Sequence, residues 1–281
     1  DRRQRQMCIR DRYHPFAWLV TRNNRRLVEC PLKEVDGHYR MDLDLIRRSI
    51  KGIRVLILCN PHNPGGVVWK KEELQELAEI CADDNVIVFS DEIHADLTLP
   101  PFHHTPFAMV SEKARNNSVT FMAPSKTFNI PGVAASHTFI HNEALRERFV
   151  NYLDAGELNA GHVFAWPAVT AAYTEGEEWL AQCLAYIQGN IDYVADYIKT
   201  HMPKMKVMRP QASYLIWLDC RELGLSHEDL NAFFVDKAGL ALNDGEMFGK
   251  EGAGFMRMNV GCPRITLEKA LQQLKAAYDT L

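Results

Sequence analysis

The chain has 281 residues, of which 47% are hydrophobic and 24% are charged, and its formal net charge is −4. This composition is ordinary for a globular protein of one or two domains. The mildly acidic balance argues against nucleic acid as the main partner. No apolar run is long enough to cross a bilayer, so we expect no membrane partner either.

Seven cysteines are dispersed along the chain, and no two of them form a C-x-x-C pair. An odd, scattered set indicates neither a disulfide framework nor a zinc knuckle. The eleven histidines add no convincing ligand spacing, so we expect no metal site. Unpaired cysteines are typical of a reducing compartment, and we expect the protein in the cytoplasm.

Residues 1–12 differ from the rest of the chain. They contain five arginines and two aspartates and lack an apolar stripe. A basic arm for an acidic partner is one interpretation. We favour the other, a leader that does not look native to the protein.

From residue 13 onward, short apolar runs alternate with polar turns. Residues 54–59 (RVLILC), 86–90 (VIVFS), 119–123 and 136–140 predict strands. Residues 70–83 carry apolar side chains at helical spacing and predict an amphipathic helix. Apolar strands alternating with such a helix are typical of α/β proteins with a mostly parallel sheet covered on both faces.

The second half of the chain changes character. Residues 177–201 predict one long helix, and 206–219, 226–238, 255–260 and 266–281 predict strand, helix, strand and helix. This order indicates a smaller α+β unit. We therefore expect a large domain over residues 13–188 and a small C-terminal domain over 189–281, with the boundary inside the long helix.

Polar residues follow three of the predicted strands. The first strand leads into 60–66 (NPHNPGG), the second into 90–94 (SDEIH), and the third into 123–129 (APSKTFN). Ligands of parallel sheets gather at the carboxyl ends of the strands. A lysine, a carboxylate and an amide at such an edge suit pyridoxal phosphate (PLP), which needs an amine for its aldehyde and a carboxylate for its ring nitrogen.

In order, spacing and residue type, these three motifs resemble the signature of the class I/II aminotransferase superfamily. Within it, YHPF at 13–16, SDEIHADL at 90–97, APSKTFNIPG at 123–132 and FMRMNVGCPR at 255–264 are similar to the cystathionine β-lyase and cysteine-S-conjugate β-lyase branch. The resemblance runs from about residue 13 to the C-terminus. It implies the PLP-dependent transferase fold of type I.

The resemblance also implies roles for the residues around the cofactor. Lys126 would bond covalently to the cofactor and later move the substrate's α-proton. Asp91 would pair with the pyridine nitrogen, and Asn63 would donate to the ring oxygen. Many relatives have tyrosine where this chain has His94, so His94 would contact the cofactor, face the substrate, or serve only the structure.

Further contacts follow from the same resemblance. Ser125 would bond the phosphate, Tyr13 would stack on the ring, and Arg257 would clamp the substrate carboxylate through a bidentate pair. Many family members carry a basic residue for the phosphate where this chain has Ala134. The β-lyase branch often lacks it, so this departure favours the branch.

The implied activity is a β-elimination that cleaves cystathionine or cysteine S-conjugates to a thiol, pyruvate and ammonia. The same residues also serve an aminotransferase, and a regulatory or binding protein on this fold is a further alternative. Family members usually have a further N-terminal stretch that helps bind the phosphate. We therefore interpret the chain as N-terminally truncated, with an inert fragment as a third alternative, and expect a homodimer of the full-length form.

Overall fold

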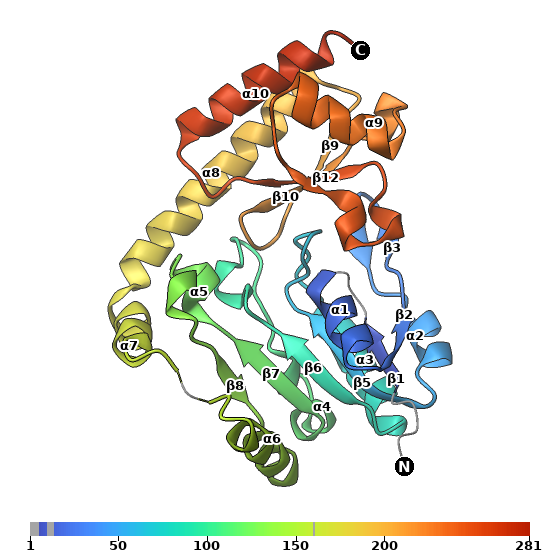
Figure 1. Ribbon diagram of the computed structural model, residues 1–281, viewed down its shortest axis with the longest axis vertical. Coiled ribbons are helices and arrows are strands. Elements are labelled where there is room, and N and C mark those ends of the chain that lie inside the picture. The colour runs from blue at the N-terminus through green and yellow to red at the C-terminus, as the bar shows by residue number, and fades with distance from the viewer. Residues whose placement is uncertain (1–5, 10–13, 160) are drawn as a thin grey trace.

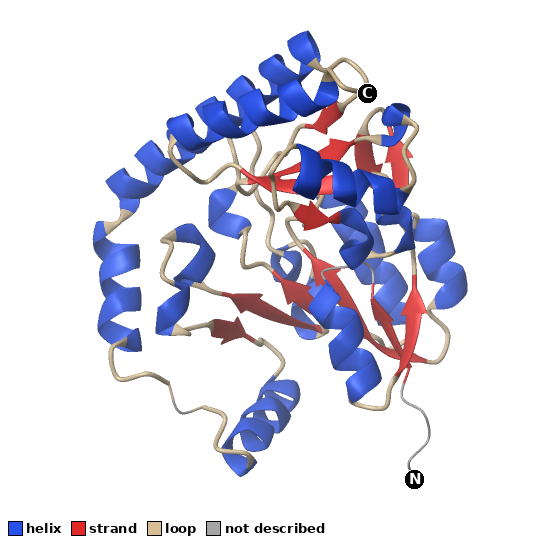
Figure 2. Cartoon of the chain, turned by 45° about the horizontal axis from the view of Figure 1, so that its top comes forward, coloured by secondary structure: helices blue, strands red, loops and turns tan. Residues whose placement is uncertain are grey.

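The computed structural model describes residues 6–9, 14–159 and 161–281. It contains two main sheets, one above the other, and a long helix that runs along one side of both (Figure 1). Figure 2 shows the strands of the two sheets as separate groups among the helices. Within the described residues, no helix combines the length and apolar character needed to span a membrane.

The larger sheet has six strands in the order β2-β1-β5-β6-β7-β8. Its strands are β1 (Gln6–Ile9), β2 (Arg26–Glu29), β5 (Ile53–Cys59), β6 (Ile87–Asp91), β7 (Ser118–Met122) and β8 (His137–Phe139). All neighbours pair in parallel except β7 and β8, which are antiparallel. The mostly parallel sheet expected from the sequence is confirmed, and its last strand is the exception.

Part of the segment that composition sets apart lies in this sheet. β1 pairs in parallel with β2 on one side and with β5 on the other. Gln6–Ile9 therefore belong to the large sheet, whatever the origin of residues 1–12.

Helices of the first half flank this sheet and its edges. They are α1 (His14–Arg22), α2 (Leu43–Ser49), α3 (Lys71–Asp83), α4 (Glu112–Asn116), α5 (Pro124–Thr127), α6 (Glu143–Ala155) and α7 (Ala165–Glu175), with the short 3-10 turns η1 (Ala95–Leu97), η2 (Phe107–Met109) and η3 (Pro131–Val133). In α3, Leu74, Leu77, Ala78 and Cys81 are buried at the spacing that predicted the helix. They join Leu56, Leu58 and Val88 of the sheet in one core.

The smaller sheet is antiparallel, in the order β11-β12-β10-β9. Its strands are β9 (Lys206–Met208), β10 (Leu215–Asp219), β11 (Asn243–Asp244) and β12 (Phe255–Asn259). Its helical elements are α8 (Glu177–His201), η4 (Arg221–Leu223), α9 (His227–Ala232), the π-helical η5 (Phe233–Lys237), η6 (Gly245–Phe248), η7 (Lys250–Gly252) and α10 (Arg264–Tyr278).

The single strand predicted over 206–219 is wrong. The segment forms two strands, β9 and β10, which pair with each other antiparallel. Between them Pro210 has no N–H for a ladder bond, and Ser213 adopts a φ of 76°. The helix predicted over 226–238 is likewise split into α9 and the wider η5.

The long helix α8 matches its predicted bounds. Its first ten residues bury no side chain, and burial begins at Ile187 and continues through Ile191, Val194 and Ile198. These side chains join the core of the smaller sheet. The domain boundary at residue 188 stays a prediction, which this change along α8 supports.

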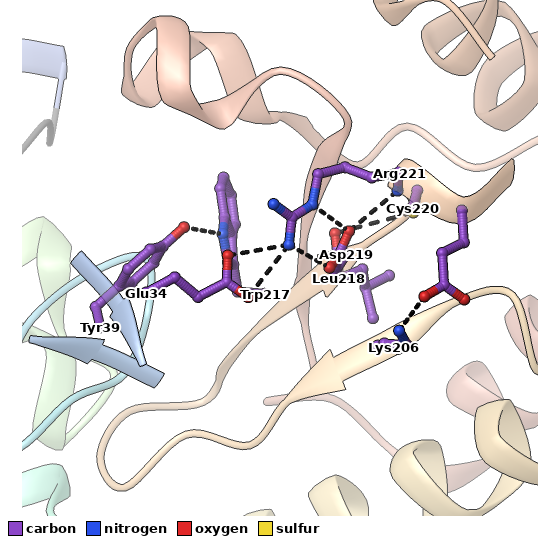
Figure 3. A network of polar contacts seen from close by, with 9 residues as sticks. Glu34, Tyr39, Lys206, Trp217, Leu218, Asp219, Cys220 and Arg221 are labelled. Carbon is purple, nitrogen blue, oxygen red and sulfur yellow. Dashed lines mark hydrogen bonds and ion pairs between the residues drawn. The ribbon is translucent and has the colours of Figure 1, made fainter. Parts of the chain in front are cut away.

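A hairpin beside the larger sheet reaches the smaller one. Its strands β3 (Lys33–Val35) and β4 (His38–Arg40) carry Glu34 and Tyr39. Arg221 donates to Glu34 at 3.0 Å and to Asp219 at 2.7 Å, and the Trp217 indole donates to the Tyr39 hydroxyl at 3.0 Å (Figure 3). These bonds fix one side of the junction between the two sheets.

A second junction lies at the turn after β5. The carbonyl of Gly66 accepts N–H bonds from Gln211 at 2.7 Å and Ala212 at 3.1 Å. Gly66 has a φ of 64°, and a Cβ there would lie 2.4 Å from the Cβ of Pro210. Only glycine fits both the backbone conformation and the close approach of the β9–β10 loop.

We expect Gly66→Ala to destabilise the protein by more than Gly37→Ala does. Both glycines have positive φ, but a Cβ on Gly37 would meet nothing within 4 Å. Gly37→Ala should cost about 1 kcal/mol of backbone strain, and Gly66→Ala roughly 2–4 kcal/mol because it adds a clash. Urea unfolding of the two variants checks this, and equal losses would contradict the tight junction.

Candidate active site

The loop after β5 brings Asn63 to the carboxyl edge of the larger sheet. The loop is held by the N–H of Asn60, which donates to the Asp91 carbonyl at 2.9 Å, and by the N–H of His62, which donates to Val67 at 2.8 Å. The Trp69 indole also donates to the Cys59 carbonyl at 2.8 Å. Asn63 itself is buried.

Asp91 ends the neighbouring strand β6. It is partly exposed, and one oxygen accepts the Ile93 N–H at 3.3 Å. Burial raises the pKa of Asp91 to about 6, against the lowering effect of this backbone bond and of the Lys126 charge. The carboxylate is therefore ionised at neutral pH, but burial makes its ionised form less stable than it would be in water.

Glu92, the next residue, has a structural role that sequence analysis missed. Its side chain is fully buried and accepts from Ser90 at 2.7 Å and from the Phe107 N–H at 2.9 Å, while His104 lies 2.7 Å from its other oxygen. Successive side chains of an extended chain point to opposite sides. Glu92 thus anchors the end of β6 through contacts on one side of the strand, and the Asp91 side chain is turned to the opposite side.

Lys126 lies in the short helix α5, after β7. The adjacent Thr127 is buried and donates to Asp96 at 3.1 Å. Asp96 also accepts from the Tyr173 hydroxyl of α7 at 3.2 Å. Burial and this carboxylate raise the pKa of Tyr173, so the phenol stays a neutral donor that helps fix the Lys126 turn.

Arg257 comes from β12 of the smaller sheet. Its guanidinium donates to Asn63 at 3.0 Å and to Asn243 at 2.8 Å, and it lies 4.6 Å from the ring centre of Phe248. Because the Asn63 oxygen accepts from Arg257, the amide nitrogen of Asn63 is the end left to donate to a ligand. The guanidinium is thus oriented before a carboxylate arrives.

His94 immediately precedes the 3-10 turn η1 and is buried. Within the described part of the chain, its Nδ1 atom has no hydrogen-bond partner. Burial lowers the pKa of His94 to about 4, helped by the charges of Lys126 and Arg257. His94 is therefore a neutral imidazole at physiological pH.

One cavity of about 200 Å³ joins these side chains. Its lining residues are Cys59, Asn63, Asp91, Ile93, His94, Lys126, Tyr214, Leu215, Asn243, Arg257 and Asn259. The structure thus brings together five residues predicted from the sequence, namely Asn63, Asp91, His94, Lys126 and Arg257.

Of the other two predicted residues, Ser125 lies in the described part of the chain. Ser125 is next to Lys126 on α5 but is not among the lining residues, so its phosphate contact stays a prediction. Tyr13 lies outside the described residues. Ala134 has a φ of 50° and ends the turn η3.

Six lining residues were not found by sequence analysis, and three of them carry a hydroxyl or amide group: Tyr214, Asn243 and Asn259. Asn259 follows Arg257 by two positions on β12, so strand alternation could have placed it on the same face. Asn243 pairs with Arg257 across β11 and β12, a pairing for which the sequence has no local signal.

The comparisons with known proteins agree with this geometry. A family model described as aminotransferase class I and II matches residues 13–274. The chain belongs to this family.

Similarity in sequence and similarity in structure both point to PLP-dependent enzymes within this family. Cystathionine beta-lyase PatB of Bacillus subtilis (strain 168) is 42% identical over 267 residues, which cover 94% of this chain and 69% of that protein. A PLP-bound putative aminotransferase from Clostridium difficile 630 superposes with a TM-score of 0.96 at 40% identity, covering 99% of this chain and 72% of that one. Cystalysin from Treponema denticola, which contains PLP, gives 0.95 at 34% identity, with 99% and 71% covered. The chain therefore has the type I fold of PLP-dependent enzymes, as the sequence predicted.

We expect Asp91→Asn to stabilise the cofactor-free protein at pH 7.5 but not near pH 4. The folded-state pKa of about 6 lies above the ordinary aspartate pKa of 3.8, so wild-type stability falls as pH rises between these values. The gain at pH 7.5 should be on the order of 2 kcal/mol. Urea unfolding at both pH values measures it, and a pH-independent effect would contradict the raised pKa.

Proposed function

We propose that the protein is a PLP-dependent carbon–sulfur β-lyase that cleaves cystathionine or cysteine S-conjugates. The supporting observation is that Lys126, Asp91, Asn63 and Arg257 converge on one cavity between the two sheets. The similar proteins include one named cystathionine beta-lyase and the PLP-containing cystalysin.

The residues present fit PLP. Burial disfavours the ionised form of Asp91, and a cationic ring nitrogen beside the carboxylate would stabilise that form. The buried Nδ1 of His94 has no partner in the described part of the chain, and a ring substituent can supply one. Lys126 would hold the cofactor covalently, and Asn63 would donate to its ring oxygen. We propose Ser125 for the phosphate and Tyr13 for the ring face.

When bound, PLP supplies an electron sink for the electron pair released at the substrate's Cα. Arg257 binds the substrate carboxylate and fixes the direction of the Cα–H bond. The Nζ amine of Lys126 takes the Cα proton. The Cβ–S bond then breaks, and the thiolate leaves with the bonding pair. With one water consumed, the products are a thiol, pyruvate and ammonium.

An aminotransferase would use the same residues, but it would return the proton to the cofactor and would need an oxo-acid acceptor. A regulatory or binding role on this fold would not need Lys126. The aminotransferase therefore differs from the lyase in its need for an acceptor, and the binding role differs in its tolerance of Lys126→Ala.

We expect Lys126→Ala to abolish the visible absorption band that forms when PLP is added and to lower pyruvate release from cystathionine by roughly 10³-fold or more. Lys199→Ala, an exposed lysine of α8, is the matched control and should change neither. Pyruvate should appear without any oxo acid.

Two results would contradict the proposal. Transfer of the cystathionine amino group to an added oxo acid, which gives the corresponding amino acid in place of ammonium, would instead show an aminotransferase. A partner interaction that survives Lys126→Ala, with no pyruvate from the wild-type protein, would show a binding role.

We further propose that the protein forms a homodimer. α6 buries none of its side chains, and α7 buries only Ala165. Together with the segment between them they expose large apolar side chains, namely Tyr152, Leu158, Val163, Phe164 and Trp166. Large apolar side chains that are left exposed in this way are typical of an interface.

We expect Trp166→Glu to weaken self-association at least about tenfold. Trp166 is 82% exposed, so a partner subunit could bury most of its ring, and a charge there would oppose that burial. Trp18→Glu, on α1 and 52% exposed, is the control. Sedimentation velocity over a concentration series measures the dissociation constant. A monomeric wild-type protein, or equal effects of both variants, would contradict this interface.

A cytoplasmic location is also proposed. In the described part of the chain Cys183, Cys220 and Cys262 are free thiols, which suits a reducing compartment.

A further inference from the structure

A second cavity, of about 330 Å³, is also lined by Lys126. It shares Lys126, Tyr214 and Asn259 with the cavity described above. Its other lining residues are Leu97, Thr127, Asn129, Trp179, Cys183, Tyr186, Ile187, Gly261, Cys262 and Pro263. The two cavities therefore adjoin along a shared wall that contains the lysine proposed to move the substrate's proton.

Apart from Lys126, the residues that line this second cavity are uncharged, and three of them are aromatic. Trp179 and Tyr186 come from the first half of α8, and Tyr214 closes the side shared with the first cavity. Burial raises the pKa of the Cys183 and Cys262 thiols, which keeps both neutral. Among the described residues that line it, Lys126 is the one charged side chain.

Several polar atoms of these walls are already occupied within the protein. The Tyr186 hydroxyl accepts the Arg264 N–H at 2.8 Å, and the Asn259 side-chain oxygen accepts the Gly261 N–H at 2.8 Å. The Thr127 hydroxyl donates to Asp96.

The guanidinium of Arg264, the residue after Pro263 of the cavity wall, is also engaged. Arg264 donates from Nε to Asn190 at 2.8 Å and lies 4.5 Å from the ring centre of Tyr193. A charged occupant of the second cavity would thus find few groups ready to pair with it.

We propose that this second cavity receives the sulfur-bearing group of the substrate and selects apolar thiols. The inference rests on the proposed lyase function. With the carboxylate at Arg257 and the Cα proton at Lys126, the space beyond Lys126 is open to the remaining substituent, the Cβ–S group. An apolar or aromatic thioether buries its surface there against Trp179 and Tyr186.

Cystathionine fits this space less well than an S-benzyl or S-phenyl conjugate does. Its leaving group carries an ammonium and a carboxylate, and desolvating charges without partners is costly. The structure therefore assigns cysteine S-conjugates with apolar leaving groups as the preferred substrate class.

The test compares S-benzyl-L-cysteine with L-cystathionine in the PLP-loaded protein. We expect kcat/KM for S-benzyl-L-cysteine to be at least about tenfold higher. Trp179→Ala should lower it by about tenfold and leave cystathionine within twofold. Trp18→Ala is the matched control, because the two tryptophans are 48% and 52% exposed and Trp18 does not line the cavity.

Calorimetric binding of both amino acids to the cofactor-free protein separates the possible failures. Tighter binding of S-benzyl-L-cysteine that Trp179→Ala removes supports the cavity assignment even if no pyruvate forms, in which case the lyase function alone is wrong. Pyruvate release with cystathionine preferred, or with both substrates equally reduced by Trp179→Ala, overturns the inference and leaves the lyase function standing. Absence of both a binding preference and a Trp179→Ala effect overturns it as well.

Discussion

The guanidinium of Arg257 reaches from the smaller sheet to Asn63 in the loop after β5 of the larger sheet. This bond joins the group proposed for the substrate carboxylate to the group proposed for the cofactor ring. It can form only if the two sheets keep their relative position. The Gly66–Gln211 contact and the Glu34–Arg221 pair hold that position on two sides of the junction.

The charges in the site are arranged by burial as much as by pairing. Burial raises the pKa of Asp91 and lowers that of His94, so one group is ionised and the other neutral at physiological pH. Glu92 stays below the strand with Ser90, His104 and the Phe107 N–H. Two adjacent carboxyl residues thus take separate roles because the backbone turns them to opposite sides.

Lys126 lines two adjoining cavities whose walls differ in polarity. On one side are Arg257, Asn63 and Asp91, which suit a charged and polar ligand. On the other side are aromatic rings and neutral thiols. An amino acid with an apolar sulfur substituent has the same division of polarity, and this correspondence is the physical basis for the proposed substrate class.

The sequence by itself determined the local elements and the motif residues. Periodicity gave α3 and α8, and apolar runs gave β5, β6 and β7, because burial on both faces of a parallel sheet leaves a plain mark in the chain. Since carboxyl ends of parallel strands share one edge, the closeness of Asn63, Asp91 and Lys126 could also be predicted.

Only the tertiary structure decided the rest. The antiparallel direction of β8, the turn that splits 206–219 into β9 and β10, and the pairing of Asn243 with Arg257 depend on contacts between distant segments. So does the second cavity, whose walls come from α8, the Lys126 turn and the segment after β12. Such contacts leave no period or spacing in the sequence, because each of the two segments could pair with many others as far as its local sequence is concerned.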